Sequence, residues 1–272
     1  MLRPADDPRV PAQVADAAIA MILGLMRGTL GGAAILSRGD VVRGPDAIAG
    51  ALPYIRRVRG SVLGIVGLGR IGSAVALRAK ACGFDVRFYD PYVADGYDKA
   101  LGIRRADSLA DLLPSCACVS LHCNPVTPGA DPVASRAAPD GYFGAREIAT
   151  LPRGAFLVNT ARGELIDETA LAAALRSGHL AAAALDVHRA EPYHRGNAAQ
   201  SGALAHAPNL FCTPHNAWYA PESRAEMRRK GAEAARKAIL SAEFRNVVNV
   251  AHLDAEAAAR REGPRRATVS RL

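Results

Sequence analysis

The chain has 272 residues, of which 50% are hydrophobic and 22% charged, a composition that supplies a core and excludes a disordered polypeptide. Its formal net charge is +8 and its pI is about 9.6, a balance that can attract acidic ligands or nucleic acid. The basic residues, however, form three separate groups, 56–59, 224–237 and 260–271, without interleaved aromatic residues. We therefore expect charged, solvent-facing surfaces and no direct nucleic-acid binding.

The cysteine content is odd in number, and several cysteines stand in apolar stretches typical of buried strands. The five are Cys82, Cys116, Cys118, Cys123 and Cys212. Such usage indicates small buried hydrophobic residues in a reducing compartment. Cys116 and Cys118 form a close pair, but no second cysteine or histidine pair stands at ligand spacing, so we expect no metal.

An apolar run at 17–26 is too short to span a bilayer. Asp6, Asp7 and Asp16 precede it, where a signal peptide would carry basic residues. We therefore expect a packing or interface helix and no membrane association.

From residue 61 onward, short apolar runs alternate with longer stretches of helical periodicity. Strands are predicted at 62–66, 85–89, 117–122, 155–159, 182–187 and 210–213. Helices are predicted at 70–82, 108–113, 167–177 and 222–240. Apolar runs without polar alternation are typical of parallel strands buried on both faces. The alternation therefore predicts an α/β fold with a doubly wound parallel (Rossmann) sheet.

Boundary residues support several of these elements. Asp167 can cap the helix that follows it, and Gly178 can end that helix in a left-handed turn. The segment 124–141, rich in Pro, Gly and Ala, predicts a surface loop, and the charged, aperiodic segment 254–272 predicts a frayed tail. Near the start of the chain a helix is predicted at 14–27, and the glycines of 28–32 should break it.

A glycine-rich motif follows the first predicted strand directly and precedes a predicted helix. Gly67 allows the tight turn, Gly69 lets a pyrophosphate approach the backbone, and Gly72 lets the helix pack closely on the strand. The free amides at the start of that helix favour the negative charge of a pyrophosphate. The second strand then ends in Asp90, whose carboxylate can accept both ribose hydroxyls and would repel a 2′-phosphate. The motif predicts an NAD site, the alternative being a structural glycine turn followed by a surface aspartate.

Three polar residues come just past the ends of predicted strands, where open α/β sheets bind ligands. Arg162 can hold a carboxylate through its planar fork, and His215 can deliver a proton to a developing alkoxide. Glu191 can keep His215 charged. These residues suit hydride transfer to a 2-keto acid. The alternative interpretation is a surface arginine, a loop glutamate and a histidine that completes a hydrogen bond. For His122 we expect a structural role or a place beside the cofactor, and for the remaining histidines a structural role.

Seven segments of the chain resemble the D-isomer-specific 2-hydroxyacid dehydrogenases, and within them the branch of the C-terminal-binding-protein corepressors. The segments are GIVGLGRIG at 64–72, RAKACGF at 78–84, FYDPY at 88–92, VSLHC at 119–123, GAFLVNTARG at 154–163, AALDVH at 183–188 and CTPH at 212–215, with WY at 218–219. The likeness extends over about 14–253. The run at 88–92 and Trp218, three residues after the histidine, point to the corepressor branch.

The resemblance implies roles for individual residues. Arg162, Glu191 and His215 match the catalytic positions of the family, Asp186 matches a residue that holds the nicotinamide carboxamide, and Trp218 matches one that lines the substrate pocket. The cofactor-binding positions implied are Gly67, Gly69, Arg70, Ile71, Gly72, Asp90, Cys123, Thr160, Ala161, Arg162, Asp186, His215 and Trp218.

The resemblance also implies an organisation and a set of partners. In the family, most of a second, substrate-binding lobe precedes the linker helix at 14–27, which lies at the interface of NAD-promoted homodimers. We expect 1–58 to hold this helix and a remnant of that truncated lobe, 59–250 to form the NAD-binding domain, and 251–272 to form a basic disordered tail. The loops at 124–141 and 192–215 are longer than in the relatives.

The resulting expectation is a corepressor-like protein with an NAD-binding dehydrogenase core. The resemblance implies transcription factors and chromatin-modifying proteins as partners, a 2-keto acid as substrate, and a location in the nucleus, with the cytoplasm as a second location. Two alternatives stay open: a metabolic D-2-hydroxyacid dehydrogenase, and a catalytically inactive NAD-binding dimerisation module.

Overall fold

A computed structural model describes residues 10–124, 142–194 and 202–241 of the chain. The predicted tail at 254–272 and nearly all of the predicted loop at 124–141 lie outside these ranges. The elements in chain order are α1 (Val10–Met26), α2 (Thr29–Ser37), α3 (Gly44–Ala51), β1 (Val62–Val66), α4 (Arg70–Ala81), β2 (Asp85–Tyr89), α5 (Tyr97–Leu101), β3 (Arg104–Arg105), α6 (Leu109–Leu112), η1 (Leu113–Ser115), β4 (Cys118–Leu121), α7 (Ala145–Thr150), β5 (Ala155–Asn159), η3 (Gly163–Leu165), α8 (Glu168–Arg176), β6 (Leu180–Leu185), η4 (Gly202–Leu204), β7 (Leu210–Cys212) and α10 (Pro221–Ser241).

The described strands form one seven-stranded sheet in the order β3-β2-β1-β4-β5-β6-β7, and every neighbouring pair is parallel. Strand β1 lies inside the sheet, and from it the chain first builds outward through β2 and β3 and then, on the other side, through β4 to β7. Such a reversal places the carboxyl ends of β1 and β4 beside a natural ligand site. The sheet confirms the predicted doubly wound α/β fold.

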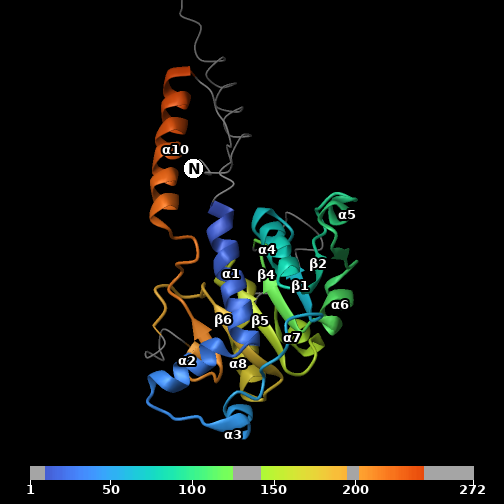
Figure 1. Ribbon diagram of the computed structural model, residues 1–272. Helices are drawn as coiled ribbons and strands as arrows, with labels where there is room; N and C mark the ends of the chain where they lie inside the picture. Colours follow the sequence, from blue (N-terminus) through green and yellow to red (C-terminus); the bar gives the residue numbers. More distant parts are fainter. Residues whose placement is uncertain (1–9, 125–141, 195–201, 242–272) are drawn as a thin grey trace, which may run out of the picture. The chain divides into compact units, whose positions relative to one another are not determined.

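Helices cover both faces of this sheet (Figure 1). Helices α1 and α4 share a core with one face, and α6, α7 and α8 share a core with the other. Because successive side chains of a strand alternate between faces, Phe156 of β5 lies in the first core and Leu157 in the second. Both side chains are fully buried.

Helix α1 packs on the sheet through small and apolar side chains at helical spacing. Ala15, Ala18 and Ile22 are fully buried in the core shared with α4, β5 and β6. Arg78 of α4 donates a hydrogen bond from Nε to Asp16 of α1 at 2.7 Å. Among the described residues no single helix is long and apolar enough to cross a membrane, although Ala12–Met26 and α2, bent by 73°, pass that test together.

The predicted break after α1 is confirmed, because α1 ends at Met26 and the chain bends by 73° before α2, but the glycines do not end the helical region. Gly28, at φ 67°, makes the turn, and α2 starts at the next residue. A Cβ at Gly31 would overlap the Tyr54 hydroxyl, so close packing is one reason why α2 carries glycine. Helix α3, which follows, was not predicted.

Helix α1 begins four residues earlier than predicted, at Val10, and the other boundaries that differ do so by one or two residues. Strand β6 starts and ends two residues earlier than predicted, because nothing in its uniform run of Leu and Ala marks a boundary. The edge strand β3 and the short helices α5 and α7 were not predicted, since their few residues carry no apolar period. Asp167 caps α8 as predicted, and Gly178 follows that helix at φ 64°.

Residues 9–219 form one compact unit, which holds the sheet, and α10 belongs to another. Helix α10 is 21 residues long and includes an exposed pair, Arg229 and Glu233, whose Nη1 and Oε1 lie 3.3 Å apart. Ile239 and Leu240, near its end, are exposed.

Candidate functional site

The glycine motif forms the turn between β1 and α4, and each of its glycines has a different steric surrounding. A Cβ at Gly67, which has φ 92°, would lie 2.7 Å from the backbone nitrogen of Cys123. A Cβ at Gly72 would overlap the Gly67 carbonyl oxygen. At Gly69, by contrast, the space is open. The turn is therefore closed toward the protein and open at Gly69, as the approach of an anionic ligand to the amides of α4 requires.

Asp90 lies where β2 ends, and its carboxylate is bound to the glycine turn. Its Oδ2 accepts a hydrogen bond from the Leu68 backbone nitrogen at 2.7 Å, and its Oδ1 accepts one from the Tyr92 nitrogen at 2.9 Å. These bonds fix the orientation of a half-buried carboxylate beside Gly67 and Gly69. Each oxygen keeps a lone pair that can accept a hydroxyl proton.

The ends of β4 and β5 supply the opposite wall of this site. Among the described residues, Nδ1 of His122 and Oγ1 of Thr160 are buried without a hydrogen-bond partner. Burial lowers the pKa of His122 to about 4 and raises that of the Cys123 thiol to about 12, so both side chains are neutral at neutral pH. Unpaired buried polar atoms indicate a polar ligand, and with the open space at Gly69 they fit a dinucleotide.

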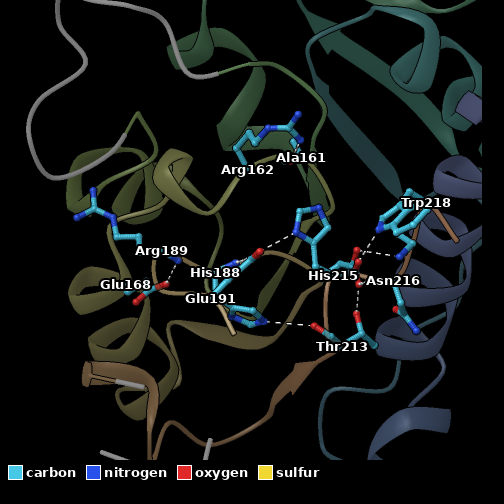
Figure 2. A network of polar contacts seen from close by, with 12 residues as sticks. Ala161, Arg162, Glu168, His188, Arg189, Glu191, Thr213, His215, Asn216 and Trp218 are labelled. Carbon is cyan, nitrogen blue, oxygen red and sulfur yellow. Dashed lines mark hydrogen bonds and ion pairs between the residues drawn. The ribbon is translucent and has the colours of Figure 1, made fainter. Parts of the chain in front are cut away.

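Arg162 lies in a tight turn after β5 that the buried side chain of Asn159 holds in place. Asn159 donates from Nδ2 to the Arg162 carbonyl oxygen at 2.8 Å and accepts through Oδ1 from the Ala161 nitrogen at 2.9 Å. The exposed guanidinium of Arg162 donates to the Ala161 carbonyl oxygen at 2.6 Å. The contacts of the described residues include none between Arg162 and either Glu191 or His215 (Figure 2).

Glu191 and His215 come together from loops after β6 and β7. His215 Nδ1 lies 2.8 Å from Glu191 Oε2 (Figure 2). The other carboxylate oxygen, Oε1, accepts a hydrogen bond from the His188 backbone nitrogen at 3.1 Å. Burial raises the pKa of Glu191, but the bonds from His215 and the His188 amide outweigh it and hold the pKa below its usual value. The pair therefore combines an ionised carboxylate with a histidine that is 40% exposed.

His188 and Asp186, just after the end of β6, bind the two loops that carry Glu191 and His215. The ring of His188 stacks on Tyr193 with centroids 3.8 Å apart, and its Nε2 lies 3.3 Å from the Thr213 carbonyl oxygen. Burial lowers the pKa of His188, so the ring is neutral and Nε2 is the donor. Asp186 is 1% exposed and accepts hydrogen bonds from the loop that carries His215.

Trp218 lies in the same loop as His215. Its indole Nε1 donates to the His215 carbonyl oxygen at 2.8 Å, and its ring meets Tyr219 edge to face at 5.6 Å. Sequence reasoning did not single out Asn159, His188 or Thr213 for this site. Their hydrogen-bond partners lie in turns and loops whose proximity cannot be inferred from the sequence. Only Asn159 could have been singled out, because it is a polar residue at the end of an apolar strand.

Residues 19–217 match the protein family described as D-isomer specific 2-hydroxyacid dehydrogenase, NAD binding domain. The chain is 38% identical over 226 residues to C-terminal-binding protein 1 of Caenorhabditis elegans, an alignment that covers 83% of this chain and 29% of that protein. It is 34% identical over 197 residues to the D-3-phosphoglycerate dehydrogenase of Methanocaldococcus jannaschii, covering 72% of this chain and 34% of that one. The crystal structure of the TT0316 protein from Thermus thermophilus matches with a TM-score of 0.70 and 33% identity, over 87% of this chain and 68% of that one.

The chain thus spans about a third of the length of the two curated relatives, 29% and 34%. The family match begins within α1 and ends two residues after His215. It includes the glycine turn, Asp90 and both loops that meet at Glu191. The chain therefore belongs to the D-isomer-specific 2-hydroxyacid dehydrogenase family, and its residues 19–217 are the NAD-binding domain of that family.

Proposed function

We propose that this chain binds NAD(H) at the turn between β1 and α4 and carries the acid–base pair of a 2-hydroxyacid dehydrogenase in Glu191 and His215. The observation that carries the proposal is the 2.8 Å contact between His215 Nδ1 and Glu191 Oε2. Both residues follow the carboxyl ends of strands, as the glycine turn does. A histidine oriented by a carboxylate is the usual arrangement for proton transfer at neutral pH.

Asp90 selects NAD over NADP in this proposal. Its carboxylate is fixed by the amides of Leu68 and Tyr92 and cannot turn away from a ligand in the glycine turn without losing both bonds. A 2′-phosphate would meet this negative charge, whereas ribose hydroxyls can donate to it. The other residues that would hold the dinucleotide are Gly67, Gly69, Arg70, Ile71, Gly72, Cys123, Thr160, Ala161, Arg162, Asp186, His215 and Trp218.

Three side chains of the protein have separate roles in the proposed reaction. When bound, NADH supplies the hydride that, with one proton, converts a 2-keto acid into a 2-hydroxy acid. Because Glu191 occupies Nδ1 of His215, the proton is delivered from Nε2 to the carbonyl oxygen. Glu191 stabilises the imidazolium before the transfer. Arg162 holds the substrate carboxylate after its guanidinium leaves the Ala161 carbonyl oxygen.

The biological role that we propose is that of a corepressor-like, NAD-binding protein. The 38% identity to the C-terminal-binding protein of C. elegans supports it, as does Trp218, three residues after His215. The proposal includes NAD-promoted homodimers, partners among transcription factors and chromatin-modifying proteins, and a location in the nucleus and cytoplasm. It divides the chain into a linker and lobe remnant at 1–58, an NAD-binding domain at 59–250 and a basic tail at 251–272.

Two other functions have an observation in their favour. The 34% identity to an archaeal D-3-phosphoglycerate dehydrogenase favours a metabolic enzyme. The bond from Arg162 to its neighbouring carbonyl oxygen favours an inactive NAD-binding dimerisation module, because the guanidinium is then withdrawn from substrate.

Oxidation of NADH in the presence of a panel of 2-keto acids tests the proposal. His215→Gln should lower the rate about 100-fold or more, a far larger effect than the loss of its one contact should have on NADH affinity. His206→Gln, a change at an exposed histidine, should have no effect. Wild-type turnover in His215→Gln would contradict the proposed acid–base role. An inactive wild-type chain whose mass in light scattering rises with NAD would favour the dimerisation module.

A further inference from the structure

Asp186 stands in the first position after β6, with its side chain 1% exposed. Its Oδ1 accepts hydrogen bonds from the Thr213 hydroxyl and, at 3.0 Å, from the Asn216 backbone nitrogen. Its Oδ2 accepts one from the Ala217 nitrogen at 2.9 Å. All three donors belong to the five-residue segment 213–217, which has His215 at its centre.

That segment needs an external support, because His215 has φ 54°. The left-handed region is sparsely populated by residues other than glycine and persists only where the surroundings over-determine it. Donors on both sides of His215, at Thr213 and at Asn216, are bound to the same buried carboxylate oxygen. The Trp218 indole closes the turn on its far side through the His215 carbonyl oxygen.

The partner of His215 is held from the same strand end. The backbone nitrogen of His188, two residues after Asp186, donates to Glu191. The ring of His188 also donates to the Thr213 carbonyl oxygen, which joins the two loops. Residues 186–188 therefore set the separation of the Glu191 carboxylate and the His215 imidazole.

We propose that Asp186 is a positioning residue, which holds the His215 turn so that Nδ1 meets Glu191. This role rests on the function proposed above, in which Glu191 and His215 form the acid–base pair. The contacts that define it are present without any bound ligand. An ionised carboxylate can accept about four hydrogen bonds, and Asp186 already has three. One lone pair of Oδ2 stays available for the cofactor, so the implied contact with the carboxamide would be an addition to this role.

The pKa of Glu191 measures the positioning, because the bond from His215 is one of the causes that hold it low. It can be followed by carbon-13 NMR of the side-chain carboxyl group in the full chain, without NADH and without turnover. The groups that face Glu191 are the His215 ring and the His188 amide and ring. His215→Gln sets the scale, since it removes the imidazole bond and should raise the Glu191 pKa.

Asp186→Asn should raise the Glu191 pKa in the same direction, because the amide keeps only one acceptor oxygen and sets an NH2 donor against a donor of the turn, so that His215 moves away. Simple loss of the negative charge at Asp186 would do the opposite and lower that pKa, so the sign separates positioning from a direct electrostatic effect. Thr213→Val should raise the Glu191 pKa by a smaller amount. Thr213→Ser, which keeps a hydroxyl, should titrate like the wild type.

An unchanged or lowered Glu191 pKa in folded Asp186→Asn would overturn the proposal, most clearly if the same variant had lost affinity for NADH. If Asp186→Asn does not fold, the Thr213 pair decides, and identical titrations of Thr213→Val and wild type overturn it. The proposed NAD(H) function can fail separately, in a wild-type chain that does not bind NADH but in which the Glu191 pKa still responds to Asp186→Asn.

Discussion

The folded chain should lose stability as the pH falls from about 7.5 to about 4.5, with His122 a main cause. Burial lowers the pKa of His122 from 6.5 to about 4. Between these values the unfolded chain binds a proton that the folded chain does not, so the free energy of unfolding falls as the pH falls. The shift corresponds to about 3 kcal/mol in full and to about 2.5 kcal/mol at pH 4.5.

Urea unfolding of the wild type and of His122→Gln at the two pH values measures this contribution. Glutamine does not titrate and can still bond to the Ser120 hydroxyl, which lies 2.8 Å from His122 Nε2. The wild type should lose about 2.5 kcal/mol more than the variant over this interval. His188, whose pKa is also lowered by burial, acts in the same direction but is present in both proteins and cancels in the difference. An equal loss in the two proteins would refute the argument that burial keeps His122 neutral.

Two further predictions concern backbone positions near the site. Gly163→Ala should destabilise the chain by about 1–3 kcal/mol and raise the Glu191 pKa, because its Cβ would overlap the His188 carbonyl group. Gly50→Ala, in an open part of α3, is the matched control and should stabilise by about 0.5–1 kcal/mol; equal effects would contradict the steric argument. Asp167→Ala should cost about 1 kcal/mol in urea unfolding, since the carboxylate accepts from two amides of the first turn of α8, and an unchanged midpoint would show that this cap contributes nothing.

The central sheet was predictable because its strands are continuous apolar runs with clear limits. Strands β1, β2 and β5 have the predicted bounds, and each is followed by a polar or glycine residue that turns the chain. Helix α2 was not predictable, because the glycines of 28–32 indicate a break and not the start of a second helix. Whether a glycine ends a helix or lets it pack, as at Gly31 beneath Tyr54, depends on a residue distant in sequence.

At the candidate site, the residues of the acid–base pair could be predicted from the sequence, but the hydrogen bonds that hold them in place could not. The residue types and strand-end positions of Glu191 and His215 suggested their pairing, and the structure brings them into contact. Sequence spacing could not predict that Arg162 bonds its neighbouring carbonyl oxygen, or that Asp186 accepts from backbone amides of another loop. Such contacts depend on how two loops from different strands lie side by side.

Titration of the chain with NADH, followed by the fluorescence of Trp218, shows whether the turn between β1 and α4 binds the dinucleotide. Trp218 is the only tryptophan, and its indole donates to the His215 carbonyl oxygen. We expect saturable binding that is lost in Asp90→Ala and retained in Asp95→Ala, a change at an exposed aspartate. A folded wild-type chain that does not bind NADH, or an Asp90→Ala variant that binds it as tightly as the wild type, would show that the glycine turn and Asp90 do not form an NAD(H) site.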